Sequence, residues 1–96
     1  MVLESTVQRA ILKFLNTIPN SDWVKPTTTN KAGWPDISGH IDGAAIFIEV
    51  KKDDKTKPSK IQEHVIDKLN RNGAIAFPCG SVGKCRENLR RWFLDV

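Results

Sequence analysis

The segment 36–51 constrains the fold more than any other part of the chain. It contains a strand-like run over 36–41, then Asp42-Gly43, then an apolar run from Ala44 that ends in Glu49-Val50-Lys51. An Asp-Gly pair between two strand-like runs is a strong signal for a tight antiparallel hairpin. A hairpin centred on this turn places Asp36 opposite a position near Glu49. We therefore expect two strands whose open ends bring two carboxylates together.

The second strand of this hairpin presents charged side chains on one face. Side chains alternate with period two along a strand, so Phe47, Glu49 and Lys51 point the same way. The apolar composition of the strand is typical of a central position in a sheet, where charges are rarely buried without a partner or a metal. A simple ion pair between Glu49 and Lys51 at a solvated strand end is the alternative, because exposed ion pairs are common.

Asp36 favours a metal site over a simple ion pair. Pro35 fixes its own backbone and pushes Trp34 into an extended conformation at the start of the first strand. Two carboxylates that meet at one strand end form a hard oxygen site suited to Mg²⁺ or Mn²⁺, and the metal relieves their mutual repulsion. The pattern predicts metal-assisted cleavage of a phosphodiester.

The order of these motifs resembles the PD-(D/E)XK nuclease superfamily, and the details resemble its VRR-NUC (virus-type replication and repair nuclease) branch, including small stand-alone phage and bacterial members. That branch typically has Glu-x-x-x-Gln on an N-terminal helix, Gly-x-Pro-Asp, Glu-x-Lys on a strand and a Gln at the start of the next helix. The matching positions are Glu4 and Gln8, Gly33 to Asp36, Glu49 to Lys51, and Gln62. The resemblance extends from Glu4 to about Ser81, which is nearly the whole chain.

The resemblance implies roles for the residues of these motifs. Asp36 and Glu49, with the backbone carbonyl of Val50, bind Mg²⁺ or Mn²⁺. Lys51 orients the attacking water or stabilises the transition state. Gln62 either positions the lysine or a phosphate, or is a surface amide.

Glu4 and Gln8 are four residues apart and share a helix face beside the apolar stripe. The resemblance makes Glu4 an auxiliary metal ligand, direct or through water. The alternative is an acid that favours the helix dipole, with Gln8 in solvent.

Candidate nucleic-acid contacts flank the motifs. Lys31 lies in a polar loop, 29–33, and Trp34 lies in the turn after this loop. Trp34 either stacks on a base or packs beside the proline that follows it. The charged run that begins at Lys51 is either a solvated connector or a holder of the phosphate backbone. The candidate DNA-binding residues are Gln8, Lys31, Trp34, Lys52, Lys55 and Lys57.

Apolar spacing and turn signals predict an α/β (α+β) fold in the order αβββαβα, with a restriction-endonuclease-like mixed sheet flanked by helices. The expected elements beside the hairpin are a helix from residue 3 to Pro19-Asn20, a strand over 22–29, a helix from Pro58-Ser59 to Asn72-Gly73, a strand over 74–78 and a helix after Ser81. The connection from Lys51 to the strand at 74–78 is long enough for a parallel, right-handed crossover. The apolar helix faces expected in the core are Leu3, Val7, Ala10, Ile11, Phe14, Leu15 and Ile18, then Ile61, Val65, Ile66 and Leu69, then Val82, Cys85, Leu89, Trp92 and Phe93.

Composition sets the remaining limits. Ninety-six residues predict a single domain, 1–96, for which dimerisation is a route to a larger binding surface. Fifteen Lys and Arg against eleven Asp and Glu give a formal charge of +4, which favours a polyanionic partner. No apolar segment approaches a membrane span and no signal peptide is evident, so we expect a soluble cytoplasmic protein.

The cysteines, histidines and basic residues near the C-terminus give weaker signals. Cys79 and Cys85 lack metal-site spacing and are expected as buried thiols rather than a disulfide. His40 and His64 are expected as bystanders, although His40 lies close enough in sequence to Asp36 to line the site. A basic strip on the last helix either binds DNA or faces solvent; its residues are Lys84, Arg86, Arg90 and Arg91.

The resemblance implies hydrolysis that leaves a 5′-phosphate and a 3′-hydroxyl. It further implies structure-selective cutting of DNA in a bacterial or phage-infected cell, by a homodimer that acts on four-way (Holliday) junctions. The alternatives are a flap, nicking or restriction-type nuclease, and a non-catalytic nucleic-acid-binding module.

Overall fold

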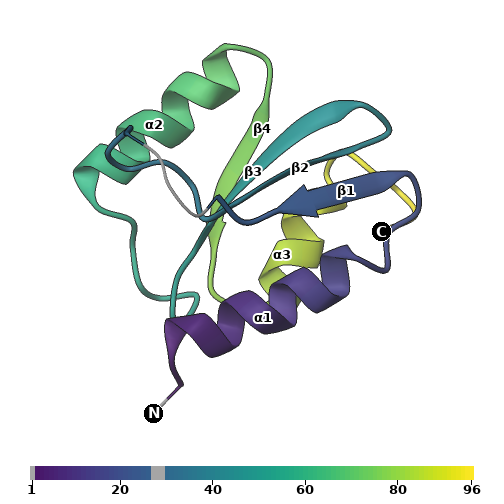
Figure 1. Cartoon of the computed structure of the whole chain (residues 1–96), viewed down its shortest axis with the longest axis horizontal. Coiled ribbons are helices and arrows are strands. Elements are labelled where there is room, and N and C mark those ends of the chain that lie inside the picture. Colours follow the sequence, from purple (N-terminus) through teal and green to yellow (C-terminus); the bar gives the residue numbers. More distant parts are fainter. Residues whose placement is uncertain (1, 27–29) are drawn as a thin grey trace.

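Three helices flank a four-stranded sheet in the part of the chain that the structure, a computed structural model, describes: residues 2–26 and 30–96 (Figure 1). The elements are α1 (Glu4–Leu15), β1 (Ser21–Val24), β2 (Ile37–Ile41), β3 (Ala44–Val50), α2 (Lys60–Arg71), β4 (Ile75–Cys79) and α3 (Val82–Leu89). The predicted order αβββαβα and the mixed sheet flanked by helices are confirmed.

The sheet has the order β1-β2-β3-β4, in which β1, β2 and β3 are antiparallel neighbours and β4 runs parallel to β3. The predicted hairpin forms at Asp42-Gly43, whose positive φ angles of 50° and 82° are those of a two-residue hairpin turn. Ile37 pairs with Ile48 near the open end of this hairpin. The residues that come next along the two strands are Asp36 and Glu49, so the register places the two carboxylates at the same end.

The main core lies on the face of the sheet that α1 and α3 cover (Figure 1). Ile46, Ile48 and Val50 of β3 point into it and are fully buried. Each such side chain contributes on the order of 1.5–3 kcal/mol by leaving water. Because β3 gives its even-numbered residues to this core, Phe47 and Glu49 face the opposite side, where α2 lies.

The free edge of β4 is partly closed by a side chain of α2. The amide of Asn70 donates to the carbonyl of Ala76 at 2.9 Å and accepts from the Ala76 N–H at 2.8 Å. This contact satisfies backbone groups that an edge strand otherwise offers to another chain. Pro78, which has no N–H, lies on the same strand.

Two predicted elements are shorter in the structure. Helix α1 ends at Leu15 rather than at Ile18, because side chains of Asn16 and Thr17 donate to the carbonyls of Leu12 and Phe14 and close the last turn. The strand predicted over 22–29 ends at Val24. Its partner β2 begins only one residue beyond the Val24–Ser38 pair, so the ladder stops there, and residues 27–29 lie outside the described part of the chain.

Four residues expected in the core are exposed. Leu3 precedes the first turn of α1, and Ala10 lies on the solvent side of that helix. Ile61 lies on the first turn of α2 and is 57% exposed. Trp92 lies beyond the end of α3, which stops at Leu89, and is 64% exposed.

Among the described residues, no helix combines the length and apolar character needed to cross a membrane.

Candidate active site

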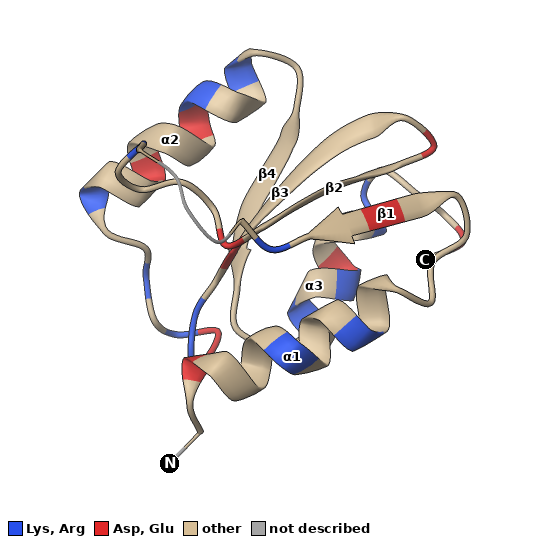
Figure 2. Ribbon diagram, viewed as in Figure 1, with Lys and Arg blue, Asp and Glu red and all other residues tan. Residues whose placement is uncertain are grey.

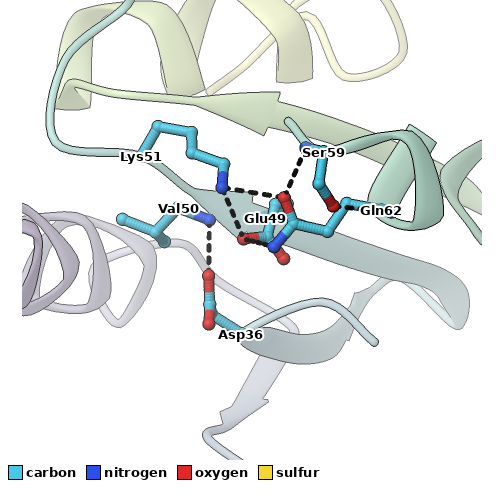
Figure 3. A network of polar contacts seen from close by, with 6 residues as sticks. All are labelled: Asp36, Glu49, Val50, Lys51, Ser59 and Gln62. Atoms are coloured by element: carbon cyan, nitrogen blue, oxygen red, sulfur yellow. Dashed lines mark hydrogen bonds and ion pairs between the residues drawn. The ribbon is translucent and has the colours of Figure 1, made fainter. Parts of the chain in front are cut away.

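Four elements deliver the predicted site residues to one place. Asp36 precedes β2, Glu49 is near the end of β3, Gln62 lies in the first turn of α2, and Glu4 begins α1. Lys51 follows β3 directly. Figure 3 shows the side chains of Asp36, Lys51 and Gln62 gathered around Glu49.

Glu49 is buried, with 2% of its surface exposed. Its Oε2 accepts a hydrogen bond from Gln62 Nε2 at 3.1 Å and lies 3.6 Å from Lys51 Nζ. Its Oε1 is buried and has no hydrogen-bond partner among the described residues. Burial, followed by the negative charge of Asp36, raises the pKa of Glu49 to about 8, against the opposing effect of Lys51. A buried carboxylate oxygen without a partner is costly, so this atom indicates a site for a cation.

Asp36 is held against the end of β3. Its Oδ2 accepts a hydrogen bond from the Val50 N–H at 2.8 Å (Figure 3). This bond orders the first carboxylate beside the second, and their mutual repulsion contributes to the raised pKa of Glu49.

Three carboxylates fit the coordination of a divalent ion. One oxygen each from Glu4, Asp36 and Glu49 lie within 4.8 Å of one another. Oxygen ligands bind Mg²⁺ at about 2.1 Å and Ca²⁺ at about 2.3–2.6 Å, so two oxygens on one ion are at most about 4.2 Å apart for Mg²⁺ and about 5 Å apart for Ca²⁺. The three carboxylates can therefore share Mg²⁺ after small side-chain shifts or with one ligand acting through water. The alternative role of Glu4 as a helix-dipole acid alone does not explain its position beside two other acids. Ligation by the Val50 carbonyl stays a prediction.

Gln62 connects the start of α2 to the site. Its Oε1 accepts hydrogen bonds from Lys51 Nζ at 2.8 Å and from the Ser59 N–H at 2.9 Å (Figure 3). The Ser59 hydroxyl in turn accepts from the Gln62 N–H, which completes a capping box. Gln62 is therefore not a solvated surface amide: one side chain both caps α2 and orients Lys51 and Glu49.

The charged run after Lys51 is a folded loop rather than a loose connector. Asp53 Oδ1 accepts bonds from the backbone and side chain of Thr56, which hold the pKa of Asp53 below its usual value. Asp54 accepts bonds from the Gly80 N–H at 2.8 Å and the Ser81 hydroxyl at 2.7 Å. Sequence reasoning missed both aspartates. The Asp54 contact joins residues 26 positions apart and leaves no local pattern, whereas the Asp53 bonds to residues two and three positions later form a local turn that the sequence could have shown. The exposed lysines of this loop are Lys52, Lys55 and Lys57.

Trp34 packs as well as lining the approach to the site. Its ring is half-buried and meets the Phe47 ring edge-on, with centroids 5.4 Å apart. Lys31 Nζ lies 5.5 Å from the centroid of the Trp34 ring. Gln8 is half-buried in α1, one turn after Glu4, and its role in DNA binding stays a prediction.

His40 is a bystander, as expected, and does not line the site. His40 lies toward the turn end of the hairpin, paired with Ala45, and its Nε2 is 3.2 Å from Asp22 Oδ2. Cys79 and Cys85 are free and buried, as expected, and their mutual contact together with burial raises the pKa of Cys79 far above the ordinary thiol range.

The basic strip near α3 is engaged within the chain. Lys84 pairs with Glu87 at 3.4 Å, the Arg86 guanidinium lies 4.8 Å from the centroid of the Phe14 ring, and Arg90 Nε donates to the Val96 carbonyl. All four basic residues of the strip are exposed, and these contacts favour the solvent-facing alternative over DNA binding.

Comparison with known proteins gives matches at the level of structure. No protein-family model and no curated protein matches the sequence. A solved structure described as "VRR_NUC domain" superposes with a TM-score of 0.81 and 25% identity, covering 94% of this chain and 97% of that chain. A second, described as "VRR_NUC domain protein", has a TM-score of 0.76 and 19% identity, covering 98% of this chain and 90% of that chain, and shows the fold alone.

Proposed function

We propose, because its fold matches VRR_NUC domain structures and its motifs resemble those of that family, that this chain is a VRR-NUC nuclease domain that hydrolyses DNA phosphodiester bonds with a bound divalent ion. Two observations carry the metal dependence: the buried Oε1 of Glu49 has no hydrogen-bond partner among the described residues, and one oxygen each of Glu4, Asp36 and Glu49 lie within 4.8 Å of one another. Such a donor set suits hard cations, and Mg²⁺ or Mn²⁺ is the proposed ion.

The proposed ligands are Asp36, Glu49 and the Val50 carbonyl, with Glu4 as an auxiliary ligand, direct or through water. A divalent ion held there lowers the pKa of a bound water and stabilises negative charge on the phosphate. Glu49 would lose its proton on binding a cation there, because the positive charge would stabilise the buried carboxylate.

Lys51 supplies a positively charged side chain at the candidate site. Its ammonium is fixed between Gln62 Oε1 at 2.8 Å and Glu49 Oε2 at 3.6 Å, so it does not have to be ordered when the substrate binds. A preorganised point charge beside the phosphate stabilises the extra negative charge of the transition state, or orients the attacking water. Gln62 acts as a positioning residue for this lysine.

The surroundings of the site support a nucleic-acid substrate. In Figure 2, blue segments alternate with a red turn along the connection from β3 to α2. This connection leaves the site and carries the exposed lysines Lys52, Lys55 and Lys57, which are proposed to contact the phosphate backbone together with Gln8, Lys31 and Trp34.

The specific substrate and assembly are proposed from the family resemblance. They are branched DNA, above all four-way (Holliday) junctions, cut by a homodimer to leave a 5′-phosphate and a 3′-hydroxyl. Two sites related by a twofold axis match a symmetric junction. An enzyme of this kind meets its DNA in the cytoplasm and acts in DNA repair.

A substrate panel tests this proposal. Labelled four-way junction, flap and linear duplex DNA are incubated with the protein in Mg²⁺, in Mn²⁺ and in chelator. We expect metal-dependent cutting, fastest on the junction. Preferential cutting of the flap or duplex would replace the junction with one of those substrates, and binding without cutting in any metal would support a non-catalytic module.

A further inference from the structure

A pocket of about 510 Å³ lies between the turn before β2 and one side of α2. The turn contributes Lys31 and Trp34, and α2 contributes His64, Val65, Lys68 and Asn72 among others. This volume is within the range of about 300–1,000 Å³ that is typical of small-ligand sites. None of these α2 residues belongs to the candidate active site.

The pocket adjoins the candidate active site through Trp34. The Trp34 ring contacts Phe47, which lies on the same face of β3 as Glu49 and two residues before it. Two residues along a strand span about 7 Å. The Trp34 and Phe47 ring centroids are a further 5.4 Å apart. A group held beside Trp34 is therefore within a few nucleotides of a phosphate at the carboxylates, at a rise of about 3.4 Å per stacked nucleotide.

The two sides of α2 have opposite charge. The side that lines the pocket carries His64 and Lys68, whereas Glu63 and Asp67 line a separate groove with Pro58. Among the described residues, the pocket lining includes two lysines and no Asp or Glu. Its charge therefore complements an anion such as a phosphate.

The turn that forms the other wall is packed tightly against α2. Gly33 has a φ of +78°, and a Cβ at this position would lie 2.6 Å from Cγ2 of Ile61. A larger residue does not fit here, so the close approach fixes the turn on the first turn of α2. The pocket is thus a preformed feature of the fold rather than one that a ligand has to open.

We propose that this pocket holds one unpaired nucleotide within a few nucleotides of the scissile phosphate. The base lies beside Trp34 and the apolar side chains of Val65 and Leu69, and the phosphate lies against Lys31 and Lys68. A base within a duplex is stacked and paired, so only an extruded or single-stranded base can enter such a pocket. The proposal rests on the proposed nuclease function and gives a physical reason for a preference for branched DNA over plain duplex.

Binding in chelator tests the pocket separately from catalysis. Two single-stranded oligomers of equal length are compared at low salt: a normal oligonucleotide, and an abasic chain of deoxyribose phosphates. One base stacked on an aromatic ring strengthens binding by about 5–150-fold. We expect the native protein to prefer the normal oligomer by about tenfold, within this range.

Two pairs of variants assign the effect to the pocket. Trp34→Leu is expected to reduce the preference for bases to less than about twofold, whereas Trp34→Phe keeps most of it because a ring remains. Lys68→Ala is expected to weaken binding of both oligomers about threefold or more, as loss of a phosphate contact does. Arg71→Ala removes the same charge from the same last turn of α2, outside the pocket lining, and is the matched control.

Equal binding of the two oligomers by the native protein would overturn the proposal, as would a base preference that survives in Trp34→Leu or no binding of either oligomer. Unfolding curves of each variant separate the loss of a contact from the loss of the fold. If Trp34→Leu unfolds, the comparison of Lys68→Ala with Arg71→Ala still tests the pocket. A base preference in a protein that never cuts DNA would support the pocket and refute the nuclease. Cutting of DNA without a base preference would support the nuclease and refute the pocket.

Discussion

At the scale of single residues, Glu49 has an unusual environment for a carboxylate. It is nearly inaccessible to solvent, one of its oxygens has no hydrogen-bond partner in the described part of the chain, and a second carboxylate lies beside it. The sequence predicts the meeting of Asp36 and Glu49 because an Asp-Gly hairpin has only one register that buries the apolar face. It does not predict the unpartnered oxygen, because that depends on how α1 and α2 close over the strand end.

The raised pKa of Glu49 predicts a pH-dependent stability. In chelator, the folded protein holds the Glu49 proton up to about pH 8, whereas the unfolded chain releases it near 4.5. The free energy of unfolding therefore carries a contribution that is complete below about pH 4.5 and is lost as the pH rises through 8. Urea unfolding of the native protein and Glu49→Gln across this range measures the effect. The variant should gain stability relative to the native protein as pH rises, and a constant difference would contradict the shift.

Lys51 and Lys52 are neighbours with different environments. Lys51 is fixed by Gln62 and Glu49, whereas Lys52 is exposed on the following loop. We expect Lys51→Ala to lower kcat by about 100- to 1,000-fold, as the loss of one preorganised transition-state contact does. Lys52→Ala should change kcat by less than about threefold, because a backbone phosphate contact acts mainly on binding. Similar losses in both variants would show that charge alone, rather than position, matters.

At the scale of elements, the α2 cap and the candidate site share a side chain. Gln62 closes the capping box with Ser59 and also contacts Lys51 and Glu49. The start of α2 after Pro58-Ser59 was predictable because caps are local. The end of α1 was not, because it depends on how two particular side chains bond back to the helix. The contact between the capping residue Gln62 and the candidate site was not predictable either, because it depends on where β3 lies relative to α2.

Comparison of Ser59→Ala with Gln62→Ala separates these two roles. Each variant removes one half of the capping box, and loss of an N-cap side chain costs about 0.5–2 kcal/mol of stability. Only Gln62→Ala also frees Lys51, so we expect its kcat to fall about 10- to 100-fold, as with outer-shell partners of metal sites. Ser59→Ala should keep kcat within about threefold of native. The kcat and the unfolding free energy are measured for both variants. Equal kcat values in the two variants would contradict a positioning role for Gln62.

At the scale of the whole molecule, the loop after β3 is tied to the junction between β4 and α3. Asp54 bonds Gly80 and Ser81, and the backbone of Asp53 lies directly over Gly80. This contact orders the lysine-bearing loop beside the site. The sequence predicts the topology because the crossover and the alternation of apolar residues leave few arrangements. It does not predict this contact, or the pocket on α2, because both depend on the packing of distant segments.

Two nearby glycines should respond to alanine with opposite signs. A Cβ on Gly80 would lie 1.9 Å from the backbone carbonyl carbon of Asp53, so Gly80→Ala forces the loop away and costs about 1–3 kcal/mol or more. A Cβ on Gly83, within α3, meets only the Ser81 hydroxyl at 4.0 Å. Gly83→Ala should therefore stabilise the protein by about 0.5–1 kcal/mol, the helix-propensity difference. Thermal unfolding measures both, and tolerance of Gly80→Ala would contradict the close packing.

The most direct test of the account compares the native protein with Glu49→Gln in the same experiment. The rate of cutting of a labelled four-way junction is measured in Mn²⁺ and in chelator, and the unfolding free energy is measured at pH 8 in chelator. The account predicts cutting only with metal by the native protein. It predicts that Glu49→Gln cuts at least about 100-fold more slowly than the native protein, because a carboxylate ligand to the metal is lost. It also predicts that the variant is at least as stable as the native protein, because a buried charge is gone. Cutting in chelator, or a stable variant that cuts within about tenfold of native, would contradict a metal-dependent site built on Glu49.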